Sequence, residues 1–417
     1  MNVDLLYGRG RMPVEFPGST QVISPRHIPG VRDEKAAFID ALRSPVGIPA
    51  LRDLVPNRGM CAIAVADVTR PAPSHKMVPW ILEECSLGPD RVVIVNGTGT
   101  HRANTAAELE GMLGADIVRR YRVVNHNAFD PGTLASVGRT ASGNEVWVNR
   151  EYAEADFKII TGFIEPHFFA GFSGGPKGVV PALAGIQTVL NLHSARMIGH
   201  PLSTWGVLDG NPTQMEIREA ALLTHPGFVA NVTLNRERQI TAVYAGDIVK
   251  AHLEGCMFAR ETAMQPVERP FDVVVTTNAG YPLDQNLYQA VKGMSAAACI
   301  VRQGGAIIAA AECSDGLPEH GNFRAILERH STVDEMLSAI DSAPGTVHDQ
   351  WEAQVLGIIL KKARVYLVSS LPAKEVELAF ITPVSSVEQA LAIEQRAMGD
   401  ISVACLPEGP YTIPYLA

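Results

Sequence analysis

Three short stretches of the sequence combine side chains suited to acid–base chemistry or anion binding with the glycine and proline of tight loops. They are DVTRPAP, which begins at Asp67, NGTGTHR, which ends at Arg102, and PHFFAGFSGGPKG, in which Lys177 follows His167 by ten residues. Histidine exchanges protons near neutral pH, and a lysine amine can bind an anion or form a covalent bond. These loops are therefore the first candidates for a reaction site.

Polar side chains in the first two loops have both a functional and a structural interpretation. The carboxylate of Asp67 can hold ligand hydroxyls, and the guanidinium of Arg70 can bind a carboxylate or phosphate through two hydrogen bonds. An ordinary salt bridge within the loop explains the same two residues equally well. In NGTGTHR the glycines permit close approach of a ligand, and His101 at the turn is either an exposed base or a histidine without a role.

The glycine-rich loop around Lys177 matches no standard phosphate or zinc motif. Gly174 and Gly175 precede the lysine, and backbone N–H groups of such a loop can bind phosphate, although the pattern GxxxxGK[ST] is absent. His193 and His200 are seven residues apart, which is compatible with one helix face. The sequence contains no HExxH or CxxC spacing, so a conventional zinc site is not indicated.

A further polar group lies on a predicted helix in YPLDQNLYQAVKG. Tyr288 and Lys292 are four residues apart and share a helix face, with Gln289 beside it. A solvated helix face is the competing interpretation. Trp351, in HDQWEAQ, is an isolated aromatic residue that alone indicates only packing.

The elements that must position these residues alternate between short apolar strands and helices. The pattern predicts strands within 61–73, 91–102, 156–169, 304–316 and 363–370, and helices within 77–88 and 104–114. This alternation is typical of parallel sheets covered by helices, which bind ligands at the carboxyl ends of their strands. We therefore expect an α/β protein with two α/β domains, largely parallel sheets and an active-site cleft between the domains.

A chain of 417 residues is too long for one ordinary core, which favours two domains. The polar, proline-bearing stretch at 265–270 marks the expected boundary. We expect an N-terminal domain at 1–268, completed by the tail at 402–417, and a C-terminal α/β domain at 269–401.

Composition argues against several classes of function. The net charge of −9 disfavours a surface for nucleic acid or anionic membranes, which needs clustered lysine and arginine. The apolar runs at 304–313 and 355–360 are shorter than the roughly 20 residues that span a bilayer, and the N-terminus lacks the apolar region of a signal peptide. The six cysteines form no CxxC pair, so we expect buried free thiols in a reducing cytoplasm.

Taken together, the motifs resemble those of the lactate racemases that depend on a nickel-pincer nucleotide. The resemblance rests on DVTRPAP, GTGTHR, PHFFAGFSGGPKG followed by NLHSAR, and YQAVKG, in that order along the chain. It covers nearly the whole sequence, and several motifs at matching separations are more specific than any one of them. It implies that the N-terminal domain binds the cofactor.

The resemblance implies a role for the most reactive residues. Lys177 corresponds to the lysine that attaches the cofactor, pyridinium-3-thioamide-5-thiocarboxylic acid mononucleotide, covalently as a thioamide. His193 corresponds to the histidine that binds nickel, while sulfur, carbon and sulfur atoms of the cofactor occupy the other three positions. His101 and His167 correspond to the two acid–base histidines.

The resemblance also implies binding roles and one departure. The residues expected to bind substrate are Arg70, Tyr288, Gln289, Lys292 and Trp351. Of these, the cations Arg70 and Lys292 would hold the substrate carboxylate. Those expected to bind the cofactor beside Lys177 are Asp67, Thr69, Gly174 and Gly175. Ala182 follows Pro181 where the family pattern has glycine, which can change the loop geometry because alanine tolerates positive φ less well. His126 and His200 match no family role.

The implied reaction needs each kind of residue. Removing the Cα proton of a 2-hydroxy acid would place two negative charges side by side, whereas hydride transfer to a cofactor gives a planar 2-keto acid. Two bases are needed because the hydroxyl points to different sides in the two enantiomers, and fixed cations keep the carboxylate in place.

We therefore expect an isomerase that racemises or epimerises a small lactate-like 2-hydroxy acid, with a cofactor made by separate synthesis enzymes. A larger acid, such as malate or a sugar acid, is the first alternative substrate. A nicotinamide-dependent 2-hydroxy acid dehydrogenase is the second alternative, disfavoured because a full GxGxxG is missing. A binding protein without turnover is the third, disfavoured because binding alone needs no second base.

Overall fold

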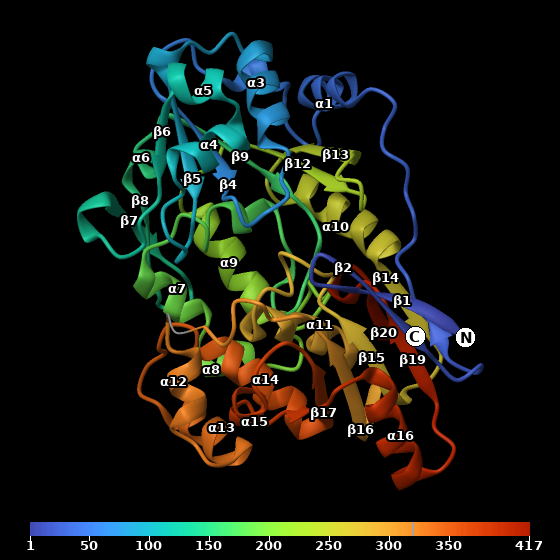
Figure 1. Cartoon of the computed structure of the whole chain (residues 1–417). Helices are drawn as coiled ribbons and strands as arrows, with labels where there is room; N and C mark the ends of the chain where they lie inside the picture. Colours follow the sequence, from blue (N-terminus) through green and yellow to red (C-terminus); the bar gives the residue numbers. More distant parts are fainter. Residues whose placement is uncertain (319–320) are drawn as a thin grey trace. The chain divides into compact units, whose positions relative to one another are not determined.

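The structure, a computed structural model, describes residues 1–318 and 321–417 and divides into two compact units (Figure 1). Unit 1 comprises Met1–Arg26, His193–Trp205 and Glu261–Ala417, and unit 2 comprises His27–Leu192 and Gly206–Arg260. Each unit contains a six-stranded sheet whose neighbouring strands are mostly parallel. The predicted α/β class with two domains and largely parallel sheets is thereby confirmed.

The large sheet of unit 2 has the strand order β13-β12-β9-β4-β5-β6, in which β13 is antiparallel to β12. Its strands are β4 (Cys61–Ala66), β5 (Val92–Gly97), β6 (Arg122–Asn125), β9 (Phe157–Phe163), β12 (Phe228–Leu234) and β13 (Ile240–Gly246). The short strands are β7 (Leu134–Arg139), β8 (Glu145–Asn149), β10 (Pro166–His167) and β11 (Gly171–Phe172). The helices are α1 (Glu34–Arg43), α2 (Leu51–Leu54), α3 (Ser74–Glu84), α4 (Ala106–Leu113), α5 (Ala115–Arg120), α6 (Arg150–Ala153), α7 (Ile186–Leu192), α9 (Pro212–Leu222) and α10 (Lys250–Ala263), with 3-10 turns η1 (Pro89–Arg91), η2 (Pro131–Thr133) and η3 (Gly175–Gly178).

The central strands of this sheet consist mostly of apolar residues because both of their faces are buried. Successive residues of a strand point to opposite faces, and in β5 every residue is buried. Side chains such as Ile63 and Ile94 form one core with Met77 and Ile81 of α3. This burial explains why the strands have continuous apolar sequences rather than an alternating pattern.

The large sheet of unit 1 has the strand order β18-β17-β16-β15-β19-β3, and every neighbouring pair is parallel. Its strands are β3 (Gln21–Val22), β15 (Phe271–Thr277), β16 (Val301–Ala310), β17 (Ala363–Val368), β18 (Thr382–Pro383) and β19 (Val403–Leu406). Two further pairs are β1 (Asn2–Tyr7) with β2 (Gly10–Glu15), and β14 (Met264–Val267) with β20 (Ile413–Leu416). The helices are α8 (Ala195–Ile198), α11 (Leu287–Ala298), α12 (Phe323–Glu328), α13 (Val333–Ser342), α14 (Gln350–Lys362), α15 (Ala373–Leu378) and α16 (Val387–Met398), with the 3-10 turn η4 (Gly409–Tyr411).

The division into units differs from the expected domain limits at both ends of the chain. In the structure, β19 lies between β15 and β3, and β20 pairs with β14, so the tail at 402–417 belongs to unit 1. It does not complete the domain that was expected at 1–268. Residues 1–26 also join unit 1, through β3 at the sheet edge. Local periodicity identifies such strands but does not show which sheet they join.

The predicted helices are present with shifted ends. The helix expected within 77–88 is α3, which begins earlier, at Ser74, and ends at Glu84. The helix expected within 104–114 is α4, whose first turn is closed by reciprocal hydrogen bonds between Thr105 and Glu108. YQAVKG lies on α11, as the spacing of Tyr288 and Lys292 predicted.

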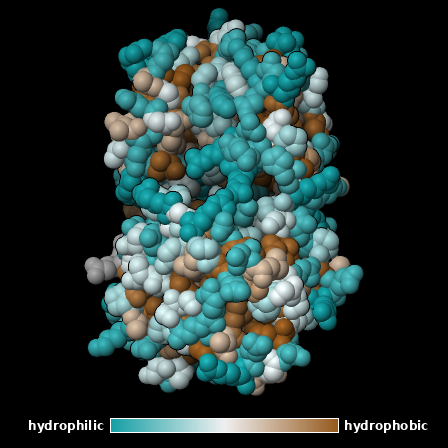
Figure 2. Space-filling view, turned by 45° about the vertical axis from the view of Figure 1, so that its right-hand side comes forward, coloured by the Kyte–Doolittle hydropathy of each residue, from teal (hydrophilic) through white to brown (hydrophobic). Residues whose placement is uncertain are grey.

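No helix within the described ranges is both long and apolar enough to cross a membrane. On the face drawn in Figure 2, apolar residues form scattered patches among hydrophilic ones. The six cysteines are all free, and four of them, Cys61, Cys256, Cys313 and Cys405, are buried.

Gly293 marks a close approach of α11 to β15 that can be tested by substitution. A Cβ atom at Gly293 would lie 2.1 Å from the Thr277 carbonyl oxygen, whereas one at Gly111 in α4 would meet nothing within 4 Å. We expect Gly293→Ala to lower the free energy of unfolding by about 1–3 kcal/mol, because two backbone segments must separate. The control Gly111→Ala should be neutral or stabilising by up to about 1 kcal/mol. Urea unfolding followed by circular dichroism measures both, and an unchanged Gly293→Ala variant would contradict this contact.

Candidate active site

The residues predicted to transfer protons follow three neighbouring strands of the unit 2 sheet. β4 lies between β9 and β5 and is parallel to both. The loop after β9 carries His167, the loop after β4 carries Asp67, and the loop after β5 carries His101. Because the carboxyl ends of parallel strands share one edge of a sheet, the topology places all three loops at that edge.

Asp67 connects the loop after β4 to the loop after β5. Its side chain is 3% exposed, and its Oδ2 lies 2.8 Å from Nδ1 of His101. Its Oδ1 accepts a hydrogen bond of 2.7 Å from the Thr69 hydroxyl. Burial raises the pKa of a carboxyl group, but here the hydrogen bond and charge of His101, with Thr69 and the charge of Arg70, outweigh it and lower the pKa of Asp67. The carboxylate therefore stays ionised and holds the Nδ1–H tautomer of His101, which leaves Nε2 as the proton acceptor.

A set of asparagine side chains fixes the loop that carries His101. The Asn96 amide donates to Asn104 Oδ1 at 2.9 Å and to Asn125 Oδ1 at 2.8 Å. Asn104 Oδ1 also accepts from the backbone of Val68, in the Asp67 loop, at 3.2 Å. The ends of β4, β5 and β6 are thus joined by polar contacts beneath the candidate site.

Ala182, the departure from the family pattern, fits its position without strain. Its φ is not positive, so no residue-specific penalty arises there. Its carbonyl oxygen accepts the Gly99 N–H at 2.9 Å, which joins the lysine loop to the turn before His101. Gly99 itself has a φ of +56°, a conformation that favours glycine.

His167 contacts the side chain of Lys177. Lys177 Nζ lies 3.2 Å from His167 Nε2 and 5.4 Å from the centre of the Phe169 ring. On the other side of the imidazole, Nδ1 accepts the backbone N–H of Ala170 at 3.3 Å and that of Phe169 at 3.5 Å. Both histidine nitrogens are therefore engaged within the loop.

Two buried side chains hold the turn before Lys177. The Gly175 N–H donates to Asn231 Oδ1 of β12 at 2.6 Å, and His252 Nε2 of α10 donates to the Ser173 carbonyl oxygen at 2.9 Å. Burial lowers the pKa of His252 to about 4, so it is neutral. A Cβ atom at Gly175 would lie 2.5 Å from the His252 ring, which explains the glycine there.

In unit 1 the expected substrate-binding residues gather around α11 and α14. Lys292 Nζ donates to Gln289 Oε1 at 2.7 Å, and Trp351 Nε1 donates to the Tyr288 hydroxyl at 3.1 Å. The ring of His193 lies 4.5 Å from that of Trp351. Two of the five predicted residues of this unit, Lys292 and Gln289, thus contact each other, and the other three form a chain from His193 through Trp351 to Tyr288, which sequence spacing could not establish for Trp351 or His193.

His193 does not share a helix with His200. It follows the end of α7 at Leu192 and precedes α8, which ends at Ile198. The separation of seven residues therefore reflects two short helices and a break, not a common helix face.

Sequence reasoning missed two carboxyl groups in the same cluster. Asp349 Oδ1 accepts a hydrogen bond of 3.3 Å from the Tyr288 hydroxyl. Glu352 is 1% exposed, and its pKa is raised by burial, with Asp349 adding and Lys292 opposing. Burial and the charges of Glu352 and Asp349 also raise the pKa of Tyr288, so its hydroxyl keeps its proton. The position of Glu352, directly after Trp351, was the available signal.

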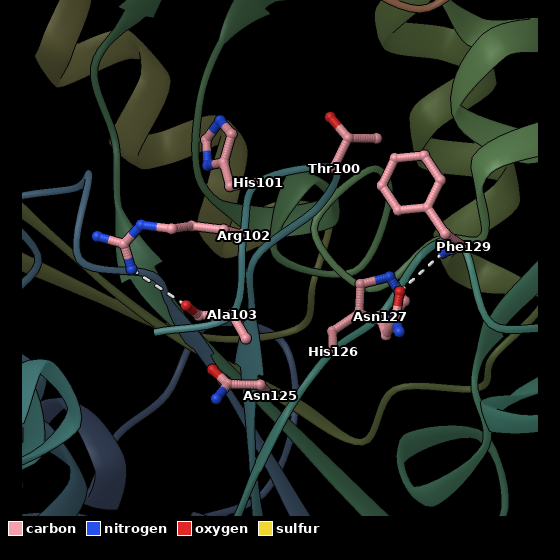
Figure 3. Close-up of a pocket in the computed structure, with 8 residues that line it drawn as sticks. All are labelled: Thr100, His101, Arg102, Ala103, Asn125, His126, Asn127 and Phe129. Carbon is pink, nitrogen blue, oxygen red and sulfur yellow. Dashed lines mark hydrogen bonds between the residues drawn. The ribbon is translucent and has the colours of Figure 1, made fainter. Parts of the chain in front are cut away.

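A pocket of about 370 Å³ lies beside His101 (Figure 3). Its lining residues are Thr100, His101, Arg102, Ala103, Asn125, His126, Asn127 and Phe129. Arg102 pairs with both oxygens of Glu108, at 2.6 and 2.8 Å, so its charge is compensated. His126 is buried, which lowers its pKa to about 4 and keeps it neutral. The pocket therefore carries little net charge.

The residues fit a metal-containing cofactor that brings its own donor atoms. Within the described ranges, no three His, Cys, Asp or Glu side chains are placed to hold a metal ion together. A metal bound by His193 would need its remaining ligands from outside the polypeptide. Lys177 lies on a turn held by Asn231 and His252, and its primary amine is a group that can form a covalent bond.

Known families of proteins match this chain over most of its length. Residues 7–206 match the lactate racemase N-terminal domain, and residues 267–413 match the lactate racemase C-terminal domain. A lactate racemase from Thermoanaerobacterium thermosaccharolyticum is 34% identical over 98% of this chain and 98% of its own. One from Lactiplantibacillus plantarum is 37% identical over 81% of this chain and 80% of its own.

Solved structures agree with the sequence comparison. The lactate racemase apoprotein from Thermoanaerobacterium thermosaccharolyticum superimposes with a TM-score of 0.94 at 33% identity, covering 99% of this chain and 100% of that one. A Thermotoga maritima protein at 20% identity, with a TM-score of 0.69 over 94% of this chain and all of its own, shares the fold.

Fold and sequence together define a cofactor-dependent isomerase built from two α/β units. The chain belongs to the lactate racemase family.

Neutralising Asp67 tests its place between the two loops. Because its folded-state pKa lies below its ordinary value of 3.8, its charge stabilises the fold above that pH, and this contribution is lost as the pH falls through the lower, folded-state pKa. We expect Asp67→Asn to lower the free energy of unfolding at neutral pH by about 1–3 kcal/mol, a deficit that shrinks in acid. Urea unfolding at a series of pH values measures this.

Asp40→Asn is the matched control, since Asp40 is an exposed carboxylate on α1. Its free energy of unfolding should show no deficit that shrinks as the pH falls. A deficit in Asp67→Asn that is constant from neutral to acid pH would contradict an ionised Asp67 held by His101.

Proposed function

We propose that this protein racemises lactate, or a close 2-hydroxy acid, by reversible hydride transfer. The observation that carries the proposal is the pair of histidines that follow strands β5 and β9 of one sheet, on either side of β4, with His101 in contact with Asp67 and His167 in contact with Lys177. The choice of lactate as the substrate is based on the relatives that are named lactate racemases.

The two histidines suit the two enantiomers. Each can take a hydroxyl proton at Nε2, and each has its Nδ1 engaged elsewhere, which fixes the direction of the ring. Asp67 stabilises the imidazolium that forms at His101.

The cofactor that we propose is the nickel-pincer nucleotide, carried by Lys177. When bound, it supplies the hydride acceptor that no side chain provides. His193, buried against Trp351, would hold nickel, for which soft sulfur and carbon donors are suitable partners. Asp67, Thr69, Gly174 and Gly175 would bind the nucleotide.

Cations would hold the substrate carboxylate while Cα inverts. Arg70 is exposed, with its backbone N–H on the Asp67 carbonyl oxygen at 3.0 Å. Lys292 is oriented by Gln289. Tyr288 and Trp351 would complete the binding surface around the lysine.

A second candidate substrate is a larger 2-hydroxy acid. The 370 Å³ pocket beside His101 favours it through its size, since lactate has only a methyl group beyond its reacting carbon. Loading of the protein with its cofactor would depend on separate cofactor-synthesis enzymes. The free cysteines favour a reducing cytoplasm as the place where the protein acts. Incubating the loaded enzyme with single enantiomers of lactate, malate and sugar acids, and following optical rotation, distinguishes the substrates.

Lys177→Ala tests the covalent attachment. The intact mass of wild type produced together with the cofactor-synthesis enzymes should exceed the mass of the chain, and the variant should show the chain mass alone, because alanine has no amine. Lys374→Ala, at an exposed position, controls for the loss of a lysine and should retain the adduct. An adduct that persists in Lys177→Ala would contradict the assignment.

Substitution of the histidines tests the proton transfers. We expect His101→Gln and His167→Gln each to lower kcat for racemisation by about 10²–10⁴-fold, since each removes one acid–base group. His200→Gln is the control and should leave kcat unchanged. Normal turnover in either of the first two variants would remove that histidine from the mechanism.

A further inference from the structure

We infer that Asp284 is a positioning residue for substrate binding, because it joins three segments of unit 1 and thereby fixes the start of α11, where Tyr288 and Gln289 lie. The inference rests on the proposed function only in naming those two side chains as substrate-binding groups. The junction of the three segments is a property of the chain alone. It can therefore be measured without cofactor or substrate.

Asp284 lies at the carboxyl-terminal edge of the unit 1 sheet, in the loop between β15 and α11. Its side chain is fully buried, and its Oδ2 accepts the N–H of Gly8 at 2.7 Å and that of Glu312 at 3.1 Å. Gly8 lies in the turn between β1 and β2, and Glu312 follows β16, the parallel neighbour of β15. One carboxyl oxygen thus ties the N-terminal hairpin to the loops after two neighbouring strands.

The hairpin turn makes further contacts with the loop that leads into α11. The Gly8 carbonyl oxygen accepts the Tyr281 N–H at 2.7 Å, and the Arg9 guanidinium lies 3.7 Å from the centre of the Tyr281 ring. A Cβ atom at Gly280 would lie 2.9 Å from the Gly8 carbonyl oxygen, so the two backbones are in close contact. A movement of the hairpin turn would therefore disturb this loop.

The first turn of α11 depends on acceptors from the same loops. The Gln289 N–H donates to Asn286 Oδ1 at 3.0 Å, and the Leu287 N–H donates to the Gly316 carbonyl oxygen at 3.3 Å. Both N–H groups belong to the first helical turn, where the helix itself offers no acceptor. Asn286 lies in the loop of Asp284, and Gly316 lies in the loop after β16. The acceptors are therefore in place only while Asp284 holds the two loops together.

The chemistry of the junction distinguishes it from an ordinary packing contact. Oδ1 of Asp284 is buried and has no hydrogen-bond partner among the residues that the structure describes, which is costly for a carboxyl group. In the same two loops Ala279 and Cys313 have φ values of +60° and +54°, which residues other than glycine rarely adopt. Unpaired buried groups and strained backbone concentrate at functional sites, where the surrounding structure imposes them.

Hydrogen–deuterium exchange of the full chain, produced without cofactor, measures the junction. Asp284→Ala removes the acceptor of two N–H groups, so we expect the backbone at 286–290 to exchange at least about tenfold faster than in wild type. Asp284→Asn keeps an oxygen for both N–H groups and should lie between Asp284→Ala and wild type. Asp4→Ala removes an exposed carboxyl group from β1 of the same hairpin and should match wild type.

Steady-state kinetics of the loaded enzyme measures the consequence for the substrate. We expect Asp284→Ala to raise KM for the 2-hydroxy acid about tenfold, with a smaller fall in kcat per loaded protein, because Tyr288 and Gln289 are no longer held in place. Asp284→Asn should restore much of the KM. A purely structural role would reduce the amount of folded protein, as followed by circular dichroism, and leave the KM of the folded fraction unchanged.

Unchanged exchange at 286–290, or an unchanged KM, in folded Asp284→Ala would overturn the inference. If Asp284→Ala does not fold, Asp284→Asn decides, and its exchange rate and KM must both exceed those of Asp4→Ala. A wild-type protein that racemises no 2-hydroxy acid, together with faster exchange in Asp284→Ala, would contradict the proposed function and leave Asp284 as the residue that fixes the start of α11.

Discussion

The buried carboxylate of Asp67 is the interaction on which the arrangement of the candidate site depends. A charge that is 3% exposed must be compensated locally, and the compensating groups come from its own loop and from the loop after the neighbouring strand. The same interaction that stabilises the charge therefore also fixes the tautomer and direction of His101. One contact thus bears both on stability and on the proton transfer that we propose for His101.

The two histidines reach comparable positions by different means. His101 depends on a charged acceptor, whereas His167 depends on backbone N–H groups and a lysine amine. The parallel sheet makes this possible, because the strand of Asp67 lies between the strands that precede the two histidine loops. The loop of His101 is held by the asparagine side chains at the ends of β5 and β6, whereas the loop of His167 and Lys177 is held by Asn231 and His252.

The α/β class and the main strands could be predicted from sequence because the signals are local. Continuous apolar runs reveal buried strands, and short motifs reveal loops that follow them. The membership of edge strands could not be predicted, since nothing within residues 1–26 or 402–417 shows which sheet they join. Partners such as His252 and Glu352 were missed for a related reason. Their importance comes from contacts with residues distant in the sequence, and a buried histidine or glutamate on a helix has no distinctive pattern.

The dependence of the lysine turn on Asn231 and His252 has a consequence for biosynthesis. Both residues are made well after Lys177, on β12 and α10. A nascent or truncated chain that lacks them has the lysine but not the turn that holds it against His167. The surroundings of Lys177 are therefore complete only in a chain in which both β12 and α10 have been made and folded.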